Sequence, residues 1–213
     1  MIEKKSLLKE KLNNAFTYLQ FKEFSEKNVR DVNPDFLNEM ERAYYDYRKL
    51  NLARVSRLEK LYKPTEGALN AISNIQNYQL WLVITEDWCG DSAQTLPVIV
   101  ALANLNKNID LKILLRDSNP NLMDLYLTHG KRSIPKLVVF DKELNEIFQW
   151  GPRPLAAKSI ADELNKKGIE KQEIIKQIHQ WYAKDGGYST EKEILELLNN
   201  NLKTNANHQT NAR

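Results

Sequence analysis

The scarcest informative residue of the chain is cysteine, because the 213 residues include only Cys89. A single thiol cannot form an intramolecular disulfide, and it cannot supply a zinc site built from several thiolates. The N-terminus lacks the apolar run of about 7 to 15 residues that a secretory signal needs. No stretch reaches the ~18 apolar residues of a membrane span. We therefore expect a cytoplasmic protein without a membrane partner, whose lone thiol stays free in a reducing compartment.

The sequence also lacks a large excess of either sign of charge. The 31 Lys and Arg residues against 28 Asp and Glu residues leave a net charge of +3, and the two signs are interleaved along the chain. A nucleic-acid interface needs clustered basic side chains, so we expect no nucleic-acid partner. The three histidines, at 129, 179 and 208, lack the spacing of metal ligands and are expected at the surface or at helix ends. We expect no metal and no cofactor.

The first 64 residues have a helical period. Apolar residues recur every three or four positions over 7–28, which predicts one helix. Asn33 followed by Pro34 predicts the start of a second helix, about 28 residues long, that ends before Pro64. A solvated polar face is the simpler interpretation of this helix, and a surface for a partner protein is the alternative. The charged residues on that face are Glu39, Glu41, Arg42, Arg48, Arg54 and Arg57.

Strands and helices alternate after Pro64. The run at 80–85 is apolar on both faces, which is typical of a buried strand with helices on either side. The order strand, helix, strand, helix predicts parallel pairing of the first two strands, and two later strands joined by a polar turn predict an antiparallel hairpin. The fold class is therefore α/β with a mixed central sheet flanked by helices. The predicted elements are helices at 67–76, 89–105 and 122–128 and strands at 80–85, 111–115, 137–140 and 146–150.

The C-terminal part is predicted to be helical. Apolar spacing indicates two helices interrupted at Gly168, and a capping pattern at Ser189-Thr190 precedes one more. The last 15 residues contain six asparagines and almost no apolar side chains. We predict an N-terminal helical extension at 1–64, a domain at 65–165, C-terminal helices at 166–200 and a disordered tail at 201–213.

Candidate chemistry lies where the first buried strand gives way to a helix, at Trp88-Cys89-Gly90-Asp91-Ser92. Unpaired amides at a helix N-terminus stabilise a thiolate, and the thiolate is the form that attacks disulfides. A free cysteine is also one of the most buried residue types, so a small apolar core residue is the alternative interpretation.

Four separated segments between residues 80 and 151 resemble the thioredoxin family. The segment from Thr85 to Ser92 resembles the family's Trp-Cys-Gly-x-Cys, and Pro97 occupies the place of its helix-kinking proline. Asp117-Ser118-Asn119-Pro120 resembles the Asp-x-Asn-Pro turn, and residues 130–140 resemble the segment Gly-x-Arg-x-Ile-Pro-x-Leu. The resemblance implies a thioredoxin-like fold with extra helices at both termini. It also implies a cis peptide at Ile134-Pro135 facing the thiol.

The resemblance further implies roles for individual residues. Cys89 and Ser92 take the catalytic positions, and the substrate groove comprises Trp88, Gly90, Asp91, Arg132, Ile134 and Pro135. The sequence Glu-Asp-Trp-Cys-Gly-Asp, with residues 150–154, resembles more specifically a little-characterised bacterial subfamily that has added helices at both ends. Arg153 lies between two prolines, where a solvated loop arginine is the favoured interpretation and anion binding is the alternative.

Two departures from the family decide which mechanism is possible. Ser92 replaces the second cysteine, and Val83 stands where the family has a buried acid. Without a resolving thiol the dithiol cycle is excluded. A monothiol cycle remains, in which Cys89 reacts with a disulfide-containing protein or a low-molecular-weight thiol partner, and an external thiol resolves the intermediate. The alternatives are a redox-inert adaptor that binds a partner protein through its terminal helices, and a sensor thiol.

Carboxylates flank Cys89 in the sequence, and two basic residues are expected near it in the fold. Nearby carboxylates disfavour a thiolate, whereas basic residues that the fold brings close favour it. The helix N-terminus and Arg132 predict a modestly lowered pKa for Cys89. A capped, solvated helix start is the alternative interpretation of the acidic cluster. The acidic residues are Glu86, Asp87 and Asp91, and the basic residues are Lys131 and Arg132.

Overall fold

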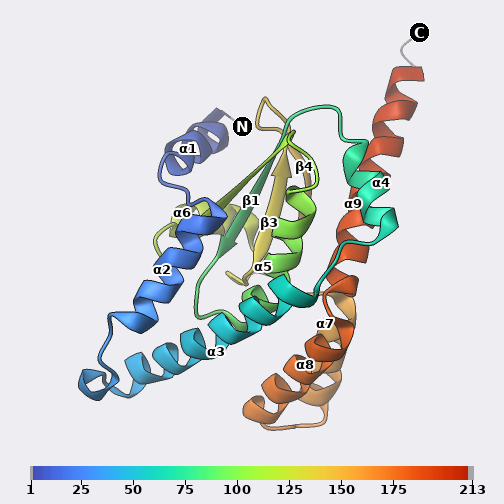
Figure 1. Ribbon diagram of the computed structural model, residues 1–213. Helices are drawn as coiled ribbons and strands as arrows, with labels where there is room; N and C mark the ends of the chain where they lie inside the picture. Colours follow the sequence, from blue (N-terminus) through green and yellow to red (C-terminus); the bar gives the residue numbers. More distant parts are fainter. Residues whose placement is uncertain (1, 211–213) are drawn as a thin grey trace.

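A mixed sheet lies at the centre of the computed structural model, which describes the backbone of residues 2–210 and the side chains of residues 3–201 (Figure 1). The strand order is β2-β1-β3-β4. Strand β1 (Gln79–Thr85) pairs in parallel with β2 (Ile109–Leu115) and antiparallel with β3 (Lys136–Phe140). Strand β4 (Glu146–Trp150) pairs antiparallel with β3. The predicted α/β class, the parallel pair and the hairpin are confirmed.

Alternation along β1 divides the protein interior into two cores, because successive side chains point to opposite faces of a sheet. Trp81 and Val83 lie in the core covered by α5 (Gly90–Ala103), α4 (Glu66–Ser73) and the start of α9 (Tyr188–Thr210). Leu82 and its even-numbered neighbours lie in the core covered by α1 (Ile2–Leu12) and α6 (Pro120–Met123). Both faces of β1 are therefore buried, as its apolar run predicts.

The N-terminal region contains two helices where the sequence predicts one. Helix α1 ends at Leu12, and α2 (Tyr18–Arg30) starts after a capping box formed by Thr17 and Gln20. Between them the backbone of Phe16 exchanges two hydrogen bonds with Ile113 of β2, at 2.8 and 2.9 Å. This edge pairing interrupts the predicted helix at 7–28, because an extended residue cannot also be helical.

The long helix starts later than Pro34. Residues Pro34–Phe36 form a short 3-10 turn, η1, and α3 (Glu39–Leu61) begins after a capping box between Asn38 and Glu41. A capping box satisfies amides at the helix start that have no partner within the helix. The predicted helix over 122–128 is also shorter, because α6 passes into a 3-10 turn, η2 (Asp124–Tyr126).

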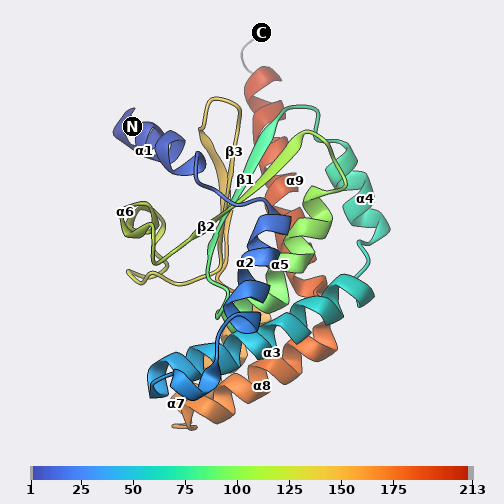
Figure 2. The ribbon, with the colours of Figure 1, turned by 60° about the vertical axis from the view of Figure 1, so that its left-hand side comes forward.

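Three helices follow the sheet, and the last of them, α9, lies beside α4 (Figures 1 and 2). Helices α7 (Leu155–Lys166) and α8 (Lys171–Asp185) pack on each other around a small core of their own, and they separate near Gly168 as predicted. Helix α9 runs to Thr210, into the range 201–213 for which the sequence predicts a disordered tail. No proline or glycine interrupts the chain there. Residues 211–213 lie outside the described residues.

The described helices also bear on membrane association. Among residues 2–210, none of the helices combines the length and the apolar character that a bilayer crossing requires.

Candidate functional site

Cys89 lies at the junction of β1 and α5, in the position that the sequence predicts. It is the N-cap residue of α5, and its side chain makes no capping hydrogen bond. Its Sγ donates instead to the carbonyl oxygen of Ile134, at 3.4 Å. The Ile134-Pro135 peptide is cis, so the expectation from the resemblance is confirmed. The thiol is therefore held between a helix start and the turn before β3.

Burial determines the acidity of this thiol. Cys89 is 8% exposed, and burial raises the pKa of the thiol to about 11, with the negative charge of Asp91 as the second cause. Hydrogen bonds from the Ser92 side chain and from the amides of residues 91 and 92 lower the pKa, but by less. The predicted lowering of the Cys89 pKa is therefore wrong. The helix N-terminus is present, but the loss of water around the sulfur outweighs it.

Ser92 is buried one helical turn beyond Cys89. Its hydroxyl forms a short hydrogen bond with the hydroxyl of Thr85, at the end of β1. The hydrogen bond between the Ser92 side chain and Cys89 stabilises the thiolate form. Ser92 thus links the sulfur to the last residue of the central strand.

Asp87 anchors the loop that carries Cys89. Its carboxylate accepts hydrogen bonds from Nε of Arg48, at 2.8 and 2.9 Å, and from Nδ2 of Asn28, at 2.7 Å. Its backbone carbonyl accepts from Nδ2 of Asn51, at 3.0 Å. Helices α2 and α3 therefore fix the loop from one side, and the alternative interpretation of the acidic cluster as a solvated helix start does not hold at this residue.

Glu86 is buried on the other side of the same loop. Its Oε1 accepts a hydrogen bond from the backbone amide of Asp117, at 2.8 Å. Burial raises the pKa of Glu86 to about 7, while this amide and the Arg116 guanidinium partly oppose the rise. Glu86 is thus a buried acid next to the loop, half-protonated near neutral pH.

Asp91 in the first turn of α5 has two partners from the C-terminal region. The Arg153 guanidinium forms a short ion pair with it, and the Tyr182 hydroxyl of α8 donates to it at 2.9 Å. Burial raises the pKa of Asp91 and the Arg153 guanidinium opposes the rise. The prediction that Arg153 lies free in solvent is wrong, because its guanidinium is paired with the Asp91 carboxylate of α5.

Gly90 permits helix α8 to approach the thiol closely. A Cβ on this residue would lie 2.8 Å from Nε2 of His179, and real Cβ atoms essentially never lie within 3.0 Å of such a neighbour. Burial lowers the pKa of His179 to about 4, so its imidazole is neutral near pH 7. Its Nδ1 lies 3.4 Å from the side-chain amide of Gln94. His179 is therefore part of the site and not the surface residue that the sequence predicts; His129 is exposed, and the side chain of His208 lies outside the described ones.

A pocket of about 310 Å³ opens over Cys89, between α3 and α8. The Trp88 ring lies at its rim, 5.2 Å from the ring of Tyr44 and 4.9 Å from the Arg116 guanidinium. Figure 2 shows both α3 and α8 below the sheet. The residues that line the pocket are Tyr44, Tyr47, Trp88, Cys89, Gly90, Asp91, Arg153, Lys171, Ile175, Ile178 and His179.

The predicted groove residues divide into two groups. Trp88, Gly90 and Asp91 line the pocket, while Ile134 and Pro135 are buried behind the thiol. Arg132 is placed elsewhere, because its guanidinium pairs with the Asp124 carboxylate at 2.7 and 2.8 Å on the exposed surface. It is not among the residues that line the pocket.

Sequence reasoning missed the contribution of the added helices to this pocket. Tyr44, Tyr47, Arg48 and Asn51 recur at the spacing of one helix face, and so do the α8 residues 171, 175, 178, 179 and 182. The helical period was a visible signal, but it does not tell which surface a helix face covers. Arg48 and Asn51 face the cysteine loop, so the solvated interpretation of the α3 polar face is wrong at these positions.

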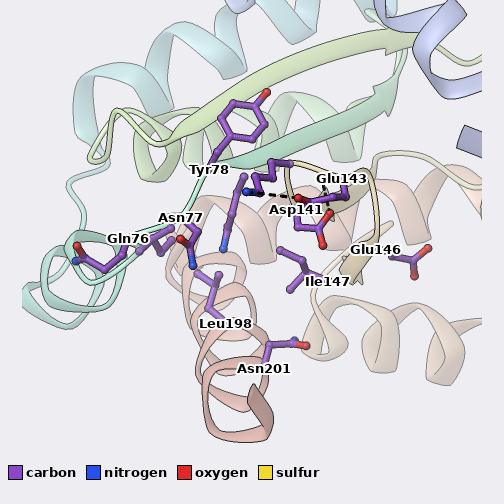
Figure 3. A pocket seen from close by; sticks show the side chains of 12 residues that line it. Gln76, Asn77, Tyr78, Asp141, Glu143, Glu146, Ile147, Leu198 and Asn201 are labelled. Atoms are coloured by element: carbon purple, nitrogen blue, oxygen red, sulfur yellow. Dashed lines mark hydrogen bonds and ion pairs between the residues drawn. The ribbon is translucent and has the colours of Figure 1, made fainter. Parts of the chain in front are cut away.

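A larger cavity, of about 580 Å³, lies at the opposite end of the sheet, between the start of β1, the β3–β4 turn and α9 (Figure 3). Its walls carry Asp141, Glu143 and Glu146 but no nucleophilic thiol, because Cys89 is the sole cysteine. Within the described side chains, no group of three or more His, Cys, Asp or Glu residues is arranged to hold a metal ion. The smaller pocket is therefore the candidate site.

Comparisons with solved structures show the same fold. A protein of unknown function from Pseudomonas aeruginosa aligns with a TM-score of 0.55 at 17% identity, over 87% of this chain and 98% of that one. An HIV epitope-scaffold aligns with a TM-score of 0.52 at 20% identity, over 78% of this chain and 95% of that one. No curated protein matches the chain significantly.

The family model described as Thioredoxin matches residues 37–165. This range includes α3, the cysteine loop, the whole sheet and all of α7 except its last residue. The cis-Pro turn beside a helix-capping cysteine lies within the same range. The chain belongs to the thioredoxin family.

Proposed function

We propose that the protein carries out monothiol thiol-disulfide exchange through Cys89, and that an external thiol completes the cycle. The observation that carries the proposal is the position of Cys89, in the wall of a pocket and 3.4 Å from the carbonyl before the cis-proline. A cysteine that only fills the core would not be expected to line a pocket, whereas Cys89 does. The active-site sequence and the added helices also support membership of the bacterial subfamily with Glu-Asp-Trp-Cys-Gly-Asp.

The Cys89 thiol loses a proton to solvent, and its thiolate attacks one sulfur of a bound disulfide. The disulfide bond of the substrate breaks, a mixed disulfide forms on Cys89, and the second sulfur leaves as a thiolate that takes up a proton. A low-molecular-weight thiol then attacks the mixed disulfide and returns Cys89 to the reduced form. Ser92 stabilises the thiolate before the attack and after the release.

The raised pKa of Cys89 keeps the thiolate fraction of the substrate-free protein small, and a small thiolate fraction makes the exchange slow. With a pKa of about 11, roughly one molecule in three thousand carries the thiolate at pH 7.5. The same observation favours a second candidate function, a redox-inert binding protein that uses the pocket and the helices around it. Val83 in place of the family's buried acid supports that candidate as well.

Intact-mass measurement of the folded protein treated with 2-hydroxyethyl disulfide at pH 8 separates the two functions. We expect a single adduct on the folded chain, its release by an added thiol, and no adduct on a Cys89→Ser control. Because Cys89 is the sole cysteine, no other residue can form the adduct. An adduct that forms only after the protein is unfolded in urea would overturn the proposal in favour of the binding protein.

A further inference from the structure

The charges around the Cys89 pocket do not cancel. Arg153 pairs with Asp91, and Arg48 pairs with Asp87 at 2.8 Å. Two further cations belong to the same surroundings, and neither forms an ion pair within the described part of the chain: Arg54 of α3 and Lys171 of α8. The pocket therefore has a surplus of positive charge, contributed by helices at the two ends of the chain.

Arg54 lies next to Gly90, which lines the pocket, and is not itself a lining residue. One of its terminal nitrogens, Nη1, lies 3.3 Å from the position that a Cβ on Gly90 would occupy, and it donates to Oδ1 of Asn51 at 2.9 Å. Arg54 is half-buried, and its guanidinium stays charged although burial lowers its pKa. Asp91 is the carboxylate whose charge acts on Arg54, and that carboxylate is already paired with Arg153, so Arg54 still favours a further anion in its neighbourhood.

Lys171 is the cation that α8 contributes to the pocket lining. It is the first residue of α8, its side chain is exposed, and it lines the opening. The pocket wall also has aromatic and aliphatic parts, from Tyr44, Trp88 and Ile175. A volume of about 310 Å³ is at the lower end for small-molecule sites and suits a short organic molecule.

We infer that α3 and α8 make the Cys89 pocket selective for low-molecular-weight disulfides that carry a carboxylate. The inference rests on the proposed exchange function and adds the substrate class. The sulfur of the substrate faces Cys89, its short carbon chain lies against the aromatic wall, and its carboxylate is attracted by Arg54 and Lys171. A neutral disulfide fits the same walls without that attraction, and a cationic disulfide is repelled.

Three short disulfides of different charge test this selectivity. The anionic reagent is 3,3′-dithiodipropionate, the neutral one is 2-hydroxyethyl disulfide, and the cationic one is cystamine. The rate of adduct formation on the folded protein is divided by the rate on the same chain in urea, which removes the intrinsic reactivity of each reagent. We expect this ratio to be roughly three- to tenfold larger for the anionic than for the neutral reagent, and smallest for cystamine. Added salt reduces the preference.

Charge removal at the pocket opening provides the matched comparison. Lys171→Gln is expected to reduce the anionic preference, and Lys171→Glu to abolish or reverse it. Lys184→Gln removes a similar exposed charge from α8 outside the pocket and is expected to keep the preference. Equal ratios for the three reagents, or equal effects of the variants at 171 and 184, would overturn the inference while the exchange function stands. Absence of any adduct on the folded protein would overturn the exchange function, and the inference with it.

Discussion

At the scale of single residues, two effects compete at Cys89. A helix N-terminus stabilises a nearby negative charge by typically 0.3 to 1 kcal/mol. A pKa of about 11 means that burial and Asp91 disfavour the thiolate by roughly 3 kcal/mol relative to an ordinary thiol. Burial therefore determines the state of this sulfur. Cys89 packs in the apolar core with Leu82 and Ile84, and this packing contributes to the burial that keeps the thiol protonated.

Removal of the charge at residue 91 shifts this balance. Asp91→Asn removes the negative charge that raises the Cys89 pKa, and it leaves the Arg153 cation unpaired beside the sulfur. Both changes lower the pKa of Cys89. We expect alkylation by iodoacetamide at pH 8 to become roughly three- to tenfold faster. Asp162→Asn, which removes an exposed carboxylate from α7, is the control and should leave the rate unchanged. A slower reaction of the Asp91→Asn protein would contradict the assignment.

Glu86 makes the free energy of unfolding depend on pH, and the direction follows from its raised pKa. Its pKa is raised from 4.5 to about 7, so the folded protein binds this proton more tightly than the unfolded chain does. The contribution to stability is fully present below pH 4.5 and is lost as the pH rises through 7. Glu86→Gln keeps an acceptor for the Asp117 amide and has no charge to bury. We expect it to raise the free energy of unfolding by about 1 to 3 kcal/mol at pH 8 and to change it little at pH 4.5. Urea unfolding at the two pH values checks this, and an equal effect at both would count against it.

At the scale of elements, α3 and α8 build the site around a loop of the thioredoxin core. Helix α3 fixes the loop through Arg48 and Asn51, and α8 contacts Asp91 through Tyr182. The helices lie on two sides of the cysteine, so the pocket exists only when both are in place. The position of the thiol and the shape of the pocket are therefore properties of different elements.

The anchor at Asp87 can be tested separately from the chemistry. Asp87→Ala leaves Arg48 and Asn28 without the carboxylate that they bind, and the Asp87 side chain is 1% exposed. We expect a loss of about 2 to 4 kcal/mol in the free energy of unfolding. Asp46→Ala removes a carboxylate from the exposed Arg42–Asp46 pair of α3, the helix that also carries Arg48. This variant should lose less than about 0.5 kcal/mol of the free energy of unfolding. Equal losses in the two variants would mean that the loop is not anchored there.

Local patterns in the sequence were sufficient for the elements of the core. The two-sided apolar run of β1 predicted its burial, and the β3–β4 hairpin followed from two strands with a polar turn. The N-terminal helices were less accurate, because the break at Phe16 results from pairing with Ile113, almost 100 residues away. No periodicity within residues 7–28 reports such a contact.

At the scale of the whole molecule, the first and last helices belong to one folded unit. Phe21 of α2, Leu58 of α3 and Ile194 of α9 lie in the same apolar core as β1. Glu191 of α9 accepts hydrogen bonds from the Tyr62 hydroxyl and from the amide and hydroxyl of Thr65. The division into extension and domain at residue 64 stays a prediction, but this packing favours one cooperative unfolding transition.

Glu191 offers a test of that cooperativity. Glu191→Ala leaves the Tyr62 hydroxyl and the Thr65 groups without their acceptor, and Glu191 is 3% exposed. We expect a loss of about 2 to 4 kcal/mol with a single unfolding transition retained. Glu196→Ala removes an exposed carboxylate from the same helix and should change stability by less than about 0.5 kcal/mol. A second transition, seen by fluorescence but not by circular dichroism, would contradict the picture of one unit.

The candidate site was predictable only in the part that the core supplies. Cys89, Ser92 and the cis-proline come from segments that resemble the family, and their positions followed from it. Tyr44 and His179 come from helices 45 residues before and 90 residues after the cysteine, and no local pattern connects them to it. The raised pKa results first from the burial of Cys89 in the folded protein, which a local pattern does not report, and for this reason the sequence predicted the opposite direction.

The rate of Cys89 alkylation by iodoacetamide between pH 6 and pH 9.5 tests the central claim most directly, which is that the pocket holds a reactive but protonated thiol. The neutral reagent reports the thiolate fraction, and the sole cysteine removes any background. With a pKa of about 11, the rate on the folded protein should rise tenfold with each pH unit and reach no plateau in this range. A plateau below about pH 8.5, or no reaction until the protein unfolds, would contradict the account.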